Sequence, residues 1–369
     1  MKSRRSKIAA AFLSIAVLLA IAGCSDTSAD TPASAANAAV QTDSSATTGN
    51  AATTDAAAPA DTTPANPYEG ESLKTVKLAA GAIWYVAEEK GYFEEVFNKY
   101  GIEVELVQGT IGQEAQLMER GDLHVASRML YPYLLYRAQG ADMIAFQTSK
   151  HPHPKITSIF VNKDSEIQSF EELKGKSIAA WVAGCPYMVL IELTESYGWQ
   201  ASDWEFINVA GSSLKDTLLS GEVDAVCHHQ VEGFAPLVVN GDVREIEYTL
   251  ADGLYVNGGG ATVLFGPTET ISSNPKIFTA VRDLNDEIQK WILANPDEAA
   301  AIVESVDRSP VEVSLFGWET DRSASTWGME LDLEKIKKET EATQQWMVEY
   351  GQIAQATSVD TLFDPQFYN

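Results

Sequence analysis

The chain has 369 residues, with 26 Lys or Arg against 52 Asp or Glu, and its formal net charge is −26. This balance argues against binding to nucleic acid or to anionic lipid through a basic face, because both need clustered positive charge. The length accommodates two domains, the 45% hydrophobic content is enough for a sizeable core, and three cysteines cannot build a disulfide framework.

The N-terminus has the pattern of a bacterial export signal over residues 1–23. Basic residues precede an apolar run at residues 8–21, which is shorter than the roughly 20 residues that cross a bilayer as a helix. The run ends in Leu-Ala-Ile-Ala-Gly-Cys, which resembles a lipobox, and this resemblance implies that Cys24 is lipidated and becomes the mature N-terminus. An ordinary signal peptide with a chance cysteine is the alternative. Lipid on Cys24 would attach the protein to a membrane with no transmembrane helix.

The next segment is a predicted spacer. Residues 25–67 are nearly all Ala, Thr, Ser, Asp, Pro, Gly and Asn, without an aromatic residue. Such a stretch buries too little apolar surface to offset the entropy lost on ordering. We therefore expect residues 24–70 to be the lipidated cysteine followed by a disordered tether.

The remaining body, residues 71–369, contains a repeat with an offset of 100 positions, seen most clearly in Gly121 and Gly221. Strand patterns alternate with helical patterns in each copy. This alternation predicts an α/β fold of two lobes, each with a parallel sheet flanked by helices. The expected strands are 75–80, 103–108 and 123–127 in the first copy and 177–181, 205–208 and 225–228 in the second.

A further buried strand at 261–265 suggests that the second lobe interrupts the first. Asn274 and Asn295 each precede a proline and are expected to cap helices, and residues 332–350 form a long amphipathic helix. The predicted lobe 1 comprises residues 71–162 and 258–369, and lobe 2 comprises residues 163–257. The chain would cross between them near 161–163 and near 257–260, forming a two-strand hinge.

Ligands of open α/β sheets bind beyond the carboxyl ends of the strands, so the loops there are predicted to line a cleft between the lobes. Their Gly, Ser and Thr residues allow backbone N–H groups to approach a ligand, and Arg128 adds a full positive charge suited to an oxyanion. The candidates are Ile83, Trp84, Tyr85, Gly109, Thr110, Gly112, Gln113, Ser127 and Arg128 in lobe 1, and Gly184, Cys185, Tyr187, Ser212, Ser213, His228 and His229 in lobe 2.

Each candidate has a simpler interpretation. Arg128 could belong to an ion pair, and the glycines and serines could serve only as turn residues. His228 and His229 are adjacent on a strand and face opposite ways, which disfavours a metal pair, so neither a metal nor a cofactor is expected. Cys185 and Cys227 form either a disulfide or two buried thiols. A nucleophilic Cys185 would need a base, and the sequence identifies none.

The body resembles the extracytoplasmic substrate-binding proteins of ABC importers, in the branch that includes nitrate, sulfonate, taurine and thiamine-precursor binding. The resemblance is carried by residues 87–93 (AEEKGYF), 101–104 (GIEV), 169–176 (SFEELKGK), 117–126 and 218–225. It implies a type II periplasmic-binding fold, a closing cleft, a small-molecule solute, and a permease with its ATPase as partners. The protein would be a monomer, anchored to the outer face of the cytoplasmic membrane.

Other readings of the same fold are a sensor lipoprotein and an enzyme. A sulfinate desulfinase of this fold is loosely similar at Ser127-Arg128 and at residues 364–367, but it needs a cysteine after the first strand, where this chain has Gly81-Ala82. We therefore expect no enzymatic activity. The solute would be an anion such as a sulfonate or carboxylate, although Glu232 and the aromatic residues would also suit a pyrimidine-like thiamine precursor.

Overall fold

The computed structural model describes residues 65–150, 157–229, 234–246, 261–315 and 328–369. The predicted export signal, Cys24, the crossing near 257–260 and Glu232 lie outside these ranges. The tether was expected to extend to residue 70, but the folded body begins earlier. The Tyr68 ring stacks on Phe97 with centroids 5.9 Å apart, and its hydroxyl donates to the Val96 carbonyl at 2.8 Å. The aromatic side chain anchors this end of the segment because it buries apolar area that the preceding residues lack.

Lobe 2 is built on a sheet with the strand order β7-β6-β8-β5-β9 in the described part of the chain. β6, β7 and β8 are parallel, whereas β5 runs antiparallel to both of its neighbours, β8 and β9. The strands are β5 (Thr157–Asn162), β6 (Ser177–Ala180), β7 (Glu205–Asn208), β8 (Ala225–His229) and β9 (Val243–Glu245).

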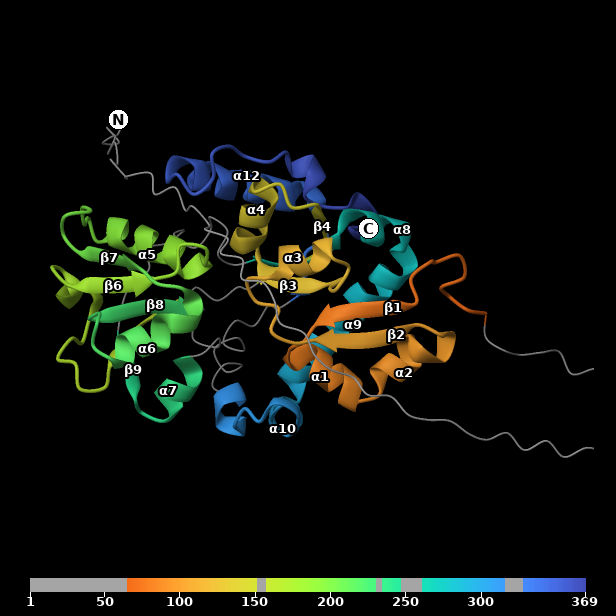
Figure 1. Cartoon of the computed structure of the whole chain (residues 1–369), viewed down its shortest axis with the longest axis horizontal. Helices are drawn as coiled ribbons and strands as arrows, with labels where there is room; N and C mark the ends of the chain where they lie inside the picture. The colour runs from red at the N-terminus through yellow and green to blue at the C-terminus, as the bar shows by residue number, and fades with distance from the viewer. Residues whose placement is uncertain (1–64, 151–156, 230–233, 247–260, 316–327) are drawn as a thin grey trace, which may run out of the picture. The chain divides into compact units, whose positions relative to one another are not determined.

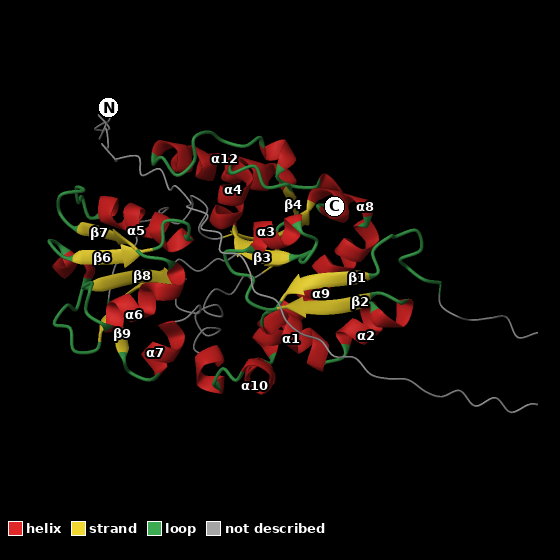
Figure 2. Cartoon of the chain, in the orientation of Figure 1, coloured by secondary structure: helices red, strands yellow, loops and turns green. Residues whose placement is uncertain are grey.

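Helices cover both faces of this sheet, with α5 on one side and α6 and α7 on the other (Figures 1 and 2). Successive residues of a strand point to opposite faces. Accordingly, Ile159 and Val161 pack with Leu190 of α5, and Phe160 packs with Leu214 of α6. The helices are α5 (Cys185–Ser196), α6 (Leu214–Leu219) and α7 (Ala235–Val239), with short 3-10 turns at Phe170–Leu173 and Gly211–Ser213.

Lobe 1 repeats this topology. β1 pairs in parallel with β2, a parallel bridge from Leu78 to Val125 joins β1 to the start of β3, and β10 runs antiparallel to β3 and β4. The bridge links the β1–β2 pair to the four-stranded sheet β11-β4-β10-β3, so the strands follow the order β2-β1-β3-β10-β4-β11. The first five match β7-β6-β8-β5-β9, as the repeat predicts. The strands are β1 (Thr75–Ala79), β2 (Glu103–Val107), β3 (Ala126–Met129), β4 (Met143–Lys150), β10 (Ala261–Pro267) and β11 (Gly328–Met329).

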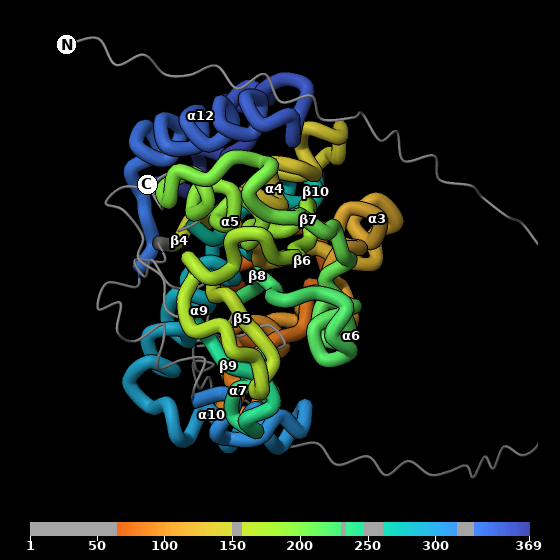
Figure 3. Tube along the Cα trace, turned by 90° about the vertical axis from the view of Figure 1, so that its left-hand side faces the viewer, coloured from red at the N-terminus to blue at the C-terminus, as the bar shows by residue number. Residues whose placement is uncertain are grey.

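One apolar cluster joins the helices of lobe 1 to its strands. In α9, buried residues recur every three or four positions from Ile277 to Ile292, the spacing of an amphipathic helix. α12 lies next to α4 (Figure 3), and the rings of Tyr131 and Trp346 meet between the two helices. The helices are α1 (Ala82–Glu89), α2 (Tyr92–Val96), α3 (Glu114–Glu119), α4 (Leu130–Ala138), α8 (Thr268–Ser273), α9 (Pro275–Ala294), α10 (Pro296–Asp307) and α12 (Leu333–Glu349), with 3-10 turns at Asn98–Tyr100, Val359–Thr361 and Pro365–Phe367.

The first crossing lies earlier than the sequence suggested. The sequence places residues 157–162 in lobe 1 without predicting a strand there, whereas β5 pairs with β8 and β9 in the sheet of lobe 2. β4 therefore belongs to the sheet of lobe 1, and the next described strand, β5, belongs to the sheet of lobe 2. β10 and β5 occupy equivalent places in the two sheets, because each runs antiparallel to the strand beside it. β10 completes lobe 1 although it follows lobe 2 in the chain.

Asn274 and Asn295 occupy the predicted N-cap positions of α9 and α10, but their side chains do not cap the helices. α9 and α10 begin at the prolines, but neither preceding asparagine makes a side-chain cap hydrogen bond. The Asn274 Oδ1 instead accepts from the backbone N–H of Ser72 and of Leu73, both at 2.9 Å. Asn274 thus fixes the segment that leads into β1.

Candidate ligand-binding site

In each lobe the central strand marks the point where the strand order reverses. β1 lies between β2 and β3, and β6 lies between β7 and β8, so the chain leaves each central strand to one side and returns on the other. A crevice forms beyond the carboxyl ends of strands at such a switch point, and ligands of α/β proteins bind there. We refer to these two places as the switch-point edges of lobe 1 and lobe 2.

At the lobe 1 edge, side chains stabilise the loop that follows β2. The Tyr85 hydroxyl of α1 donates to Gln108 Oε1 at 3.1 Å, and Gln113 Nε2 donates to the Gly109 carbonyl at 3.2 Å. Gly109 has a φ of 65°, in the left-handed region that glycine adopts without strain. Thr110 is buried within this loop, and its carbonyl accepts from the Gln113 N–H at 2.9 Å.

Arg128 lies within β3 rather than in a loop, and a buried carboxylate faces it. Its Nε is 3.4 Å from Glu114 Oε1, and the two side chains are 11% and 1% exposed. The other oxygen of Glu114 accepts from the Tyr136 hydroxyl at 2.7 Å. Burial, followed by the hydrogen bond to Glu114, raises the pKa of Tyr136, so its hydroxyl remains a neutral donor. Glu114 therefore supplies a counterion to Arg128 from within lobe 1.

The other candidates of lobe 1 differ in their exposure. Trp84 is buried in α1 with its ring 6.4 Å from that of Phe93, and Ile83 packs half-buried against the same core. Ser127 is exposed on β3, in register with Leu264 of β10.

At the lobe 2 edge, a thiol meets an imidazole. Cys185 is the first residue of α5, after β6, and His229 is the last residue of β8. Cys185 Sγ lies 2.7 Å from His229 Nε2, and Thr157 Oγ1 lies 3.3 Å from His229 Nδ1. The contact between Cys185 and His229 was missed from the sequence, although each residue was a candidate, because 44 positions separate them.

The two histidines of β8 point apart, as expected of strand neighbours. The His228 ring lies 5.4 Å from the ring of Phe234, on the opposite side from Cys185. Cys185 and Cys227 are both free and buried, so the disulfide alternative does not hold in this structure. The Cys227 Sγ donates to the Pro186 carbonyl at 3.3 Å, and burial raises the pKa of its thiol well above the usual value.

Trp181, which follows β6, lies between glycines of both lobes. A Cβ built on Gly211 would lie 3.3 Å from the indole, and one built on Gly112 of lobe 1 would lie 3.9 Å from it. Gly184, which immediately precedes α5, is similarly close at 3.5 Å. The half-buried indole is therefore a flat wall at the junction of the two edges.

Direct hydrogen bonds join the lobes beside this wall. The Tyr131 hydroxyl of α4 is 3.1 Å from the Val182 carbonyl of lobe 2 and also 3.1 Å from Gln352 Oε1. The Tyr350 hydroxyl, just after α12, donates to Glu195 of α5. Tyr187 on α5 packs its ring 4.9 Å from that of Phe206. Ser212 and Ser213 are exposed in the turn before α6.

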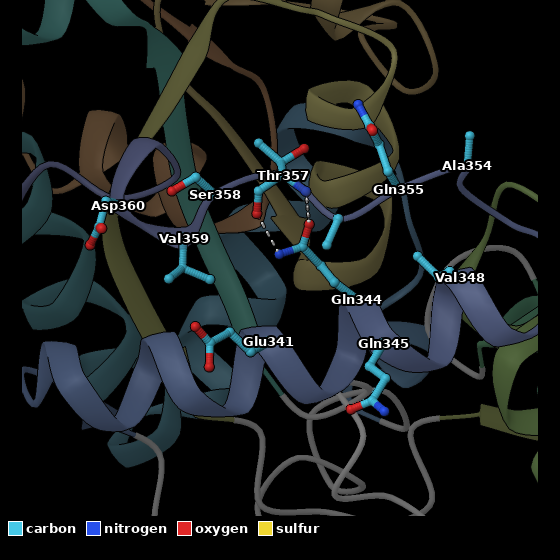
Figure 4. Close-up of a pocket in the computed structure, with 11 residues that line it drawn as sticks. Glu341, Gln344, Gln345, Val348, Ala354, Gln355, Thr357, Ser358, Val359 and Asp360 are labelled. Atoms are coloured by element: carbon cyan, nitrogen blue, oxygen red, sulfur yellow. Dashed lines mark hydrogen bonds between the residues drawn. The ribbon is translucent and has the colours of Figure 1, made fainter.

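Two larger hollows lie on lobe 1. One, of about 780 Å³, runs between α12 and residues 354–360 (Figure 4). Gln344 crosses its floor, where its amide donates to the Thr357 carbonyl at 2.9 Å and accepts from the Thr357 N–H at 2.7 Å. The other hollow, of about 660 Å³, includes Gly112 and Gln113 beside Tyr136. The first hollow is remote in the chain from the switch-point loops, whereas the second adjoins the lobe 1 edge.

Comparison with known proteins identifies the family. The family model described as NMT1/THI5-like matches residues 80–299, which is more than half of the chain. The chain belongs to the NMT1/THI5-like family. A Haemophilus influenzae protein named for thiamine biosynthesis is 31% identical over 167 residues, covering 42% of this chain and 50% of that protein. The chain thus matches about half the length of this curated relative.

Solved structures show the fold of this family member. The aliphatic sulphonate-binding protein SsuA of Escherichia coli superposes with a TM-score of 0.67 at 16% identity, over 79% of this chain and 92% of that one. The alkanesulfonate-binding SsuA of Xanthomonas axonopodis pv. citri, solved with MOPS, gives 0.66 at 16% identity, over 79% and 98%. The chain has the periplasmic-binding-protein fold, as predicted.

The family match spans the loop after β2 and the whole lobe 2 edge. Across the described ranges, no three His, Cys, Asp or Glu side chains come close enough to hold a metal ion together. None of the helices in the described part of this NMT1/THI5-like chain has the length and apolar character that crossing a membrane requires.

Proposed function

We propose that this protein is a receptor that captures a small organic solute between its lobes and delivers it to the permease and ATPase of an ABC importer. The observation that carries the proposal is the contact between the two switch-point edges, where the Tyr131 hydroxyl is 3.1 Å from the Val182 carbonyl. A solute that touches both edges stabilises the closed arrangement, because the open one forfeits half of the contacts. The similarity to the two SsuA structures, which are sulfonate-binding proteins, supports this role.

Two solute classes fit to different degrees. A sulfonate or carboxylate would depend on Arg128, but Glu114 already balances that charge. A flat, uncharged or weakly charged heteroaromatic ring could stack on Trp181 and accept hydrogen bonds from Ser212 and Ser213. The relationship to a thiamine-biosynthesis protein favours the same class. We therefore place a pyrimidine of the thiamine-precursor type ahead of an organic anion.

The proposal includes export and anchoring. Cys24 would carry the lipid and residues 25–67 would act as the tether, so that the body works at the outer face of the cytoplasmic membrane. The variant Cys24→Ala should stay unprocessed or be released from the membrane. Normal processing at the same bond, with normal membrane attachment, would refute the anchor.

Native mass spectrometry of the full chain purified from its own cells tests receptor function directly. A bound small molecule is expected, and calorimetry with an aminopyrimidine alcohol and with a simple alkanesulfonate should show tighter binding of the pyrimidine. A permease and an ATPase encoded beside this gene would support import, whereas their absence would favour a sensor. Turnover of the bound molecule would contradict the receptor role.

Variants in the turn before α6 locate the site. The double substitution of Ser212 and Ser213 by Ala should weaken binding by about 1–2 kcal/mol, or roughly five- to thirtyfold. Ser220→Ala is the matched control, because its hydroxyl donates to the Thr217 carbonyl at 3.1 Å at the far end of α6. Unchanged affinity in the double variant would remove this turn from the site.

A further inference from the structure

The lobe 2 edge holds a cysteine in an environment that favours a thiolate. Cys185 opens α5, a helix of 12 residues whose N-terminus carries partial positive charge. His229 Nε2 is 2.7 Å from the Cys185 sulfur, and Thr157 Oγ1 is 3.3 Å from His229 Nδ1. A helix N-terminus and a neighbouring imidazolium are the two features that most often convert a thiol to a nucleophilic thiolate.

The pair also lies where a ligand would enter. Cys185 follows β6 and His229 ends β8, and these two strands flank the switch point of lobe 2. The nucleophile therefore comes from the start of α5, while the base and the residue beside it, Thr157, come from the paired ends of β8 and β5. A switch point is where ligands of α/β proteins bind, so this location distinguishes the pair from a structural thiol buried within a sheet.

We propose that Cys185 and His229 form a thiolate–imidazolium pair that reacts with a small organic disulfide entering the cleft, an activity beyond solute capture. The Cys185 sulfur attacks one sulfur of the disulfide, and a new S–S bond forms as the old one breaks. The departing thiolate takes the electron pair of the broken bond and the proton of His229. The Cys185 sulfur is oxidised and the departing sulfur is reduced, so the step needs no other reactant.

Access to this thiol depends on the separation of the lobes. Cys185 is 2% exposed, and it belongs to the apolar cluster of lobe 1, although its chain position is in lobe 2. Lobe 1 therefore supplies part of its cover, which is removed when the cleft opens. Cys227 packs inside the core of lobe 2 itself and stays covered in both arrangements. Of the two cysteines in the described part of the chain, Cys185 is thus a gated thiol and Cys227 a permanently buried one.

Other ionisable groups surround the pair, and most of them keep their protons near neutral pH. Burial, followed by the charge of Tyr187 and of Cys185, raises the pKa of Tyr131, and burial also raises the pKa of Tyr187. The pKa of the Cys227 thiol is raised for the same reason. The ionisable side chains on the elements around the pair are Tyr131, Tyr133, Tyr136 and Arg137 on α4, Tyr187, Glu192 and Glu195 on α5, Cys227 and His228 on β8, and Tyr350 after α12.

The test uses 4,4′-dithiodipyridine, a small disulfide whose released thione is followed by absorbance. The full chain carries Cys24→Ser, so that only Cys185 and Cys227 remain as thiols. One equivalent should react, and peptide mapping should place the mixed disulfide on Cys185. The rate at pH 6 should stay within about tenfold of the rate at pH 9, whereas a free thiol, half-ionised near pH 8.5, slows by a few hundredfold.

Substitution of His229 distinguishes a thiolate–imidazolium pair from a purely structural hydrogen bond between Cys185 and His229. His229→Gln should lower the rate at pH 6 by at least about tenfold and change the rate at pH 9 by less than about threefold. His124→Asn, which changes a histidine in lobe 1, should leave the profile unchanged. Labelling of Cys227, a steep free-thiol profile, or an unaltered profile in His229→Gln would each overturn the proposal.

Misfolding of the His229 variant would reveal itself because Cys227 would then also react. In that event the proposal is tested by a measurement on a chain that keeps His229. The ultraviolet absorbance of a thiolate should be present at pH 6 in the Cys24→Ser chain and absent when Cys185→Ser is added. Equal absorbance in these two proteins would refute the thiolate.

Discussion

The two switch-point edges share one topology and carry different chemistry. In lobe 1, Arg128 on β3 faces Glu114, and Tyr136 completes the contact. In lobe 2, His229 on the equivalent strand β8 faces Cys185. The repeat therefore determines the positions of the side chains at each edge. The residue types determine whether the pair at that edge is structural or reactive.

The edges differ further in what buries them. Glu114 is 1% exposed and its contacts to Arg128 and Tyr136 are made within lobe 1. Cys185 instead gains cover from the opposite lobe. An interaction inside one lobe contributes to folding stability, while an interaction between lobes contributes to the balance of open and closed forms. Variants on the two sides should therefore affect different measurements.

The largest expected effect is on the stability of lobe 1. Arg128→Met leaves the Glu114 carboxylate without its cation in a buried site, which should lower the free energy of unfolding by about 3–5 kcal/mol. Urea denaturation measures this change. Arg120→Met is the matched control, because the ion pair of Arg120 with Asp122 is 59% and 50% exposed, and an exposed pair is worth about 0–1 kcal/mol.

Adding Glu114→Gln to Arg128→Met should restore much of the lost stability, since no buried charge then remains. Equal destabilisation by Arg128→Met and Arg120→Met would show that the Arg128 pair is not buried. In that case Arg128 would return to the candidate anion site.

A smaller effect is expected at the contact between the lobes. Tyr131→Phe removes the hydroxyl beside the Val182 carbonyl and keeps the ring. The closed arrangement should lose about 1 kcal/mol, which raises the population of the open form roughly fivefold. The labelling rate of Cys185 by the small disulfide should increase by the same factor.

Tyr133→Phe provides the control for this change. Tyr133 is also fully buried on α4, but its hydroxyl donates to the Leu362 carbonyl within lobe 1. This variant should lower stability without altering the labelling rate. Equal acceleration in both variants would mean that global loosening, rather than separation of the lobes, exposes the thiol.

The smallest effect concerns pH. Burial, followed by the charge of Lys77, lowers the pKa of His124, whose Nδ1 accepts from the Lys77 N–H at 3.2 Å. Below about pH 6.5 the unfolded chain binds a proton that the folded chain resists, so this group makes stability fall as pH decreases. His124→Asn keeps the acceptor and should lessen that decrease between pH 7.5 and 5.5. An identical pH dependence in wild type and variant would contradict this.

Much of the fold could be predicted because local pattern determines it. β7 has the predicted bounds, 205–208, and the two strands that run parallel to it, β6 and β8, follow from the strand–helix alternation. β5 was missed because almost all of its residues are buried, which leaves no alternation to detect. Its membership of lobe 2 depends on pairing with β8, about 70 positions further along the chain, and local pattern carries no such information.

The candidate site was predictable in outline only. Topology alone places Tyr85, Cys185 and His229 near the carboxyl ends of strands. The partners of these groups do not, because Glu114 approaches Arg128 from a helix and His229 approaches Cys185 from another strand. Charge balance and proton sharing arise from tertiary contacts, so a sequence reading of Arg128 as an anion ligand could not include its counterion.

In the proposed receptor, one solute is held by both switch-point edges. Hydrogen–deuterium exchange, compared between the full chain with its bound solute and the same protein after the solute is removed, tests this claim most directly. We predict slower exchange at residues 108–113 of lobe 1 and at residues 181–187 and 210–213 of lobe 2. Protection confined to one lobe, or found instead along residues 354–360 beside α12, would contradict the account.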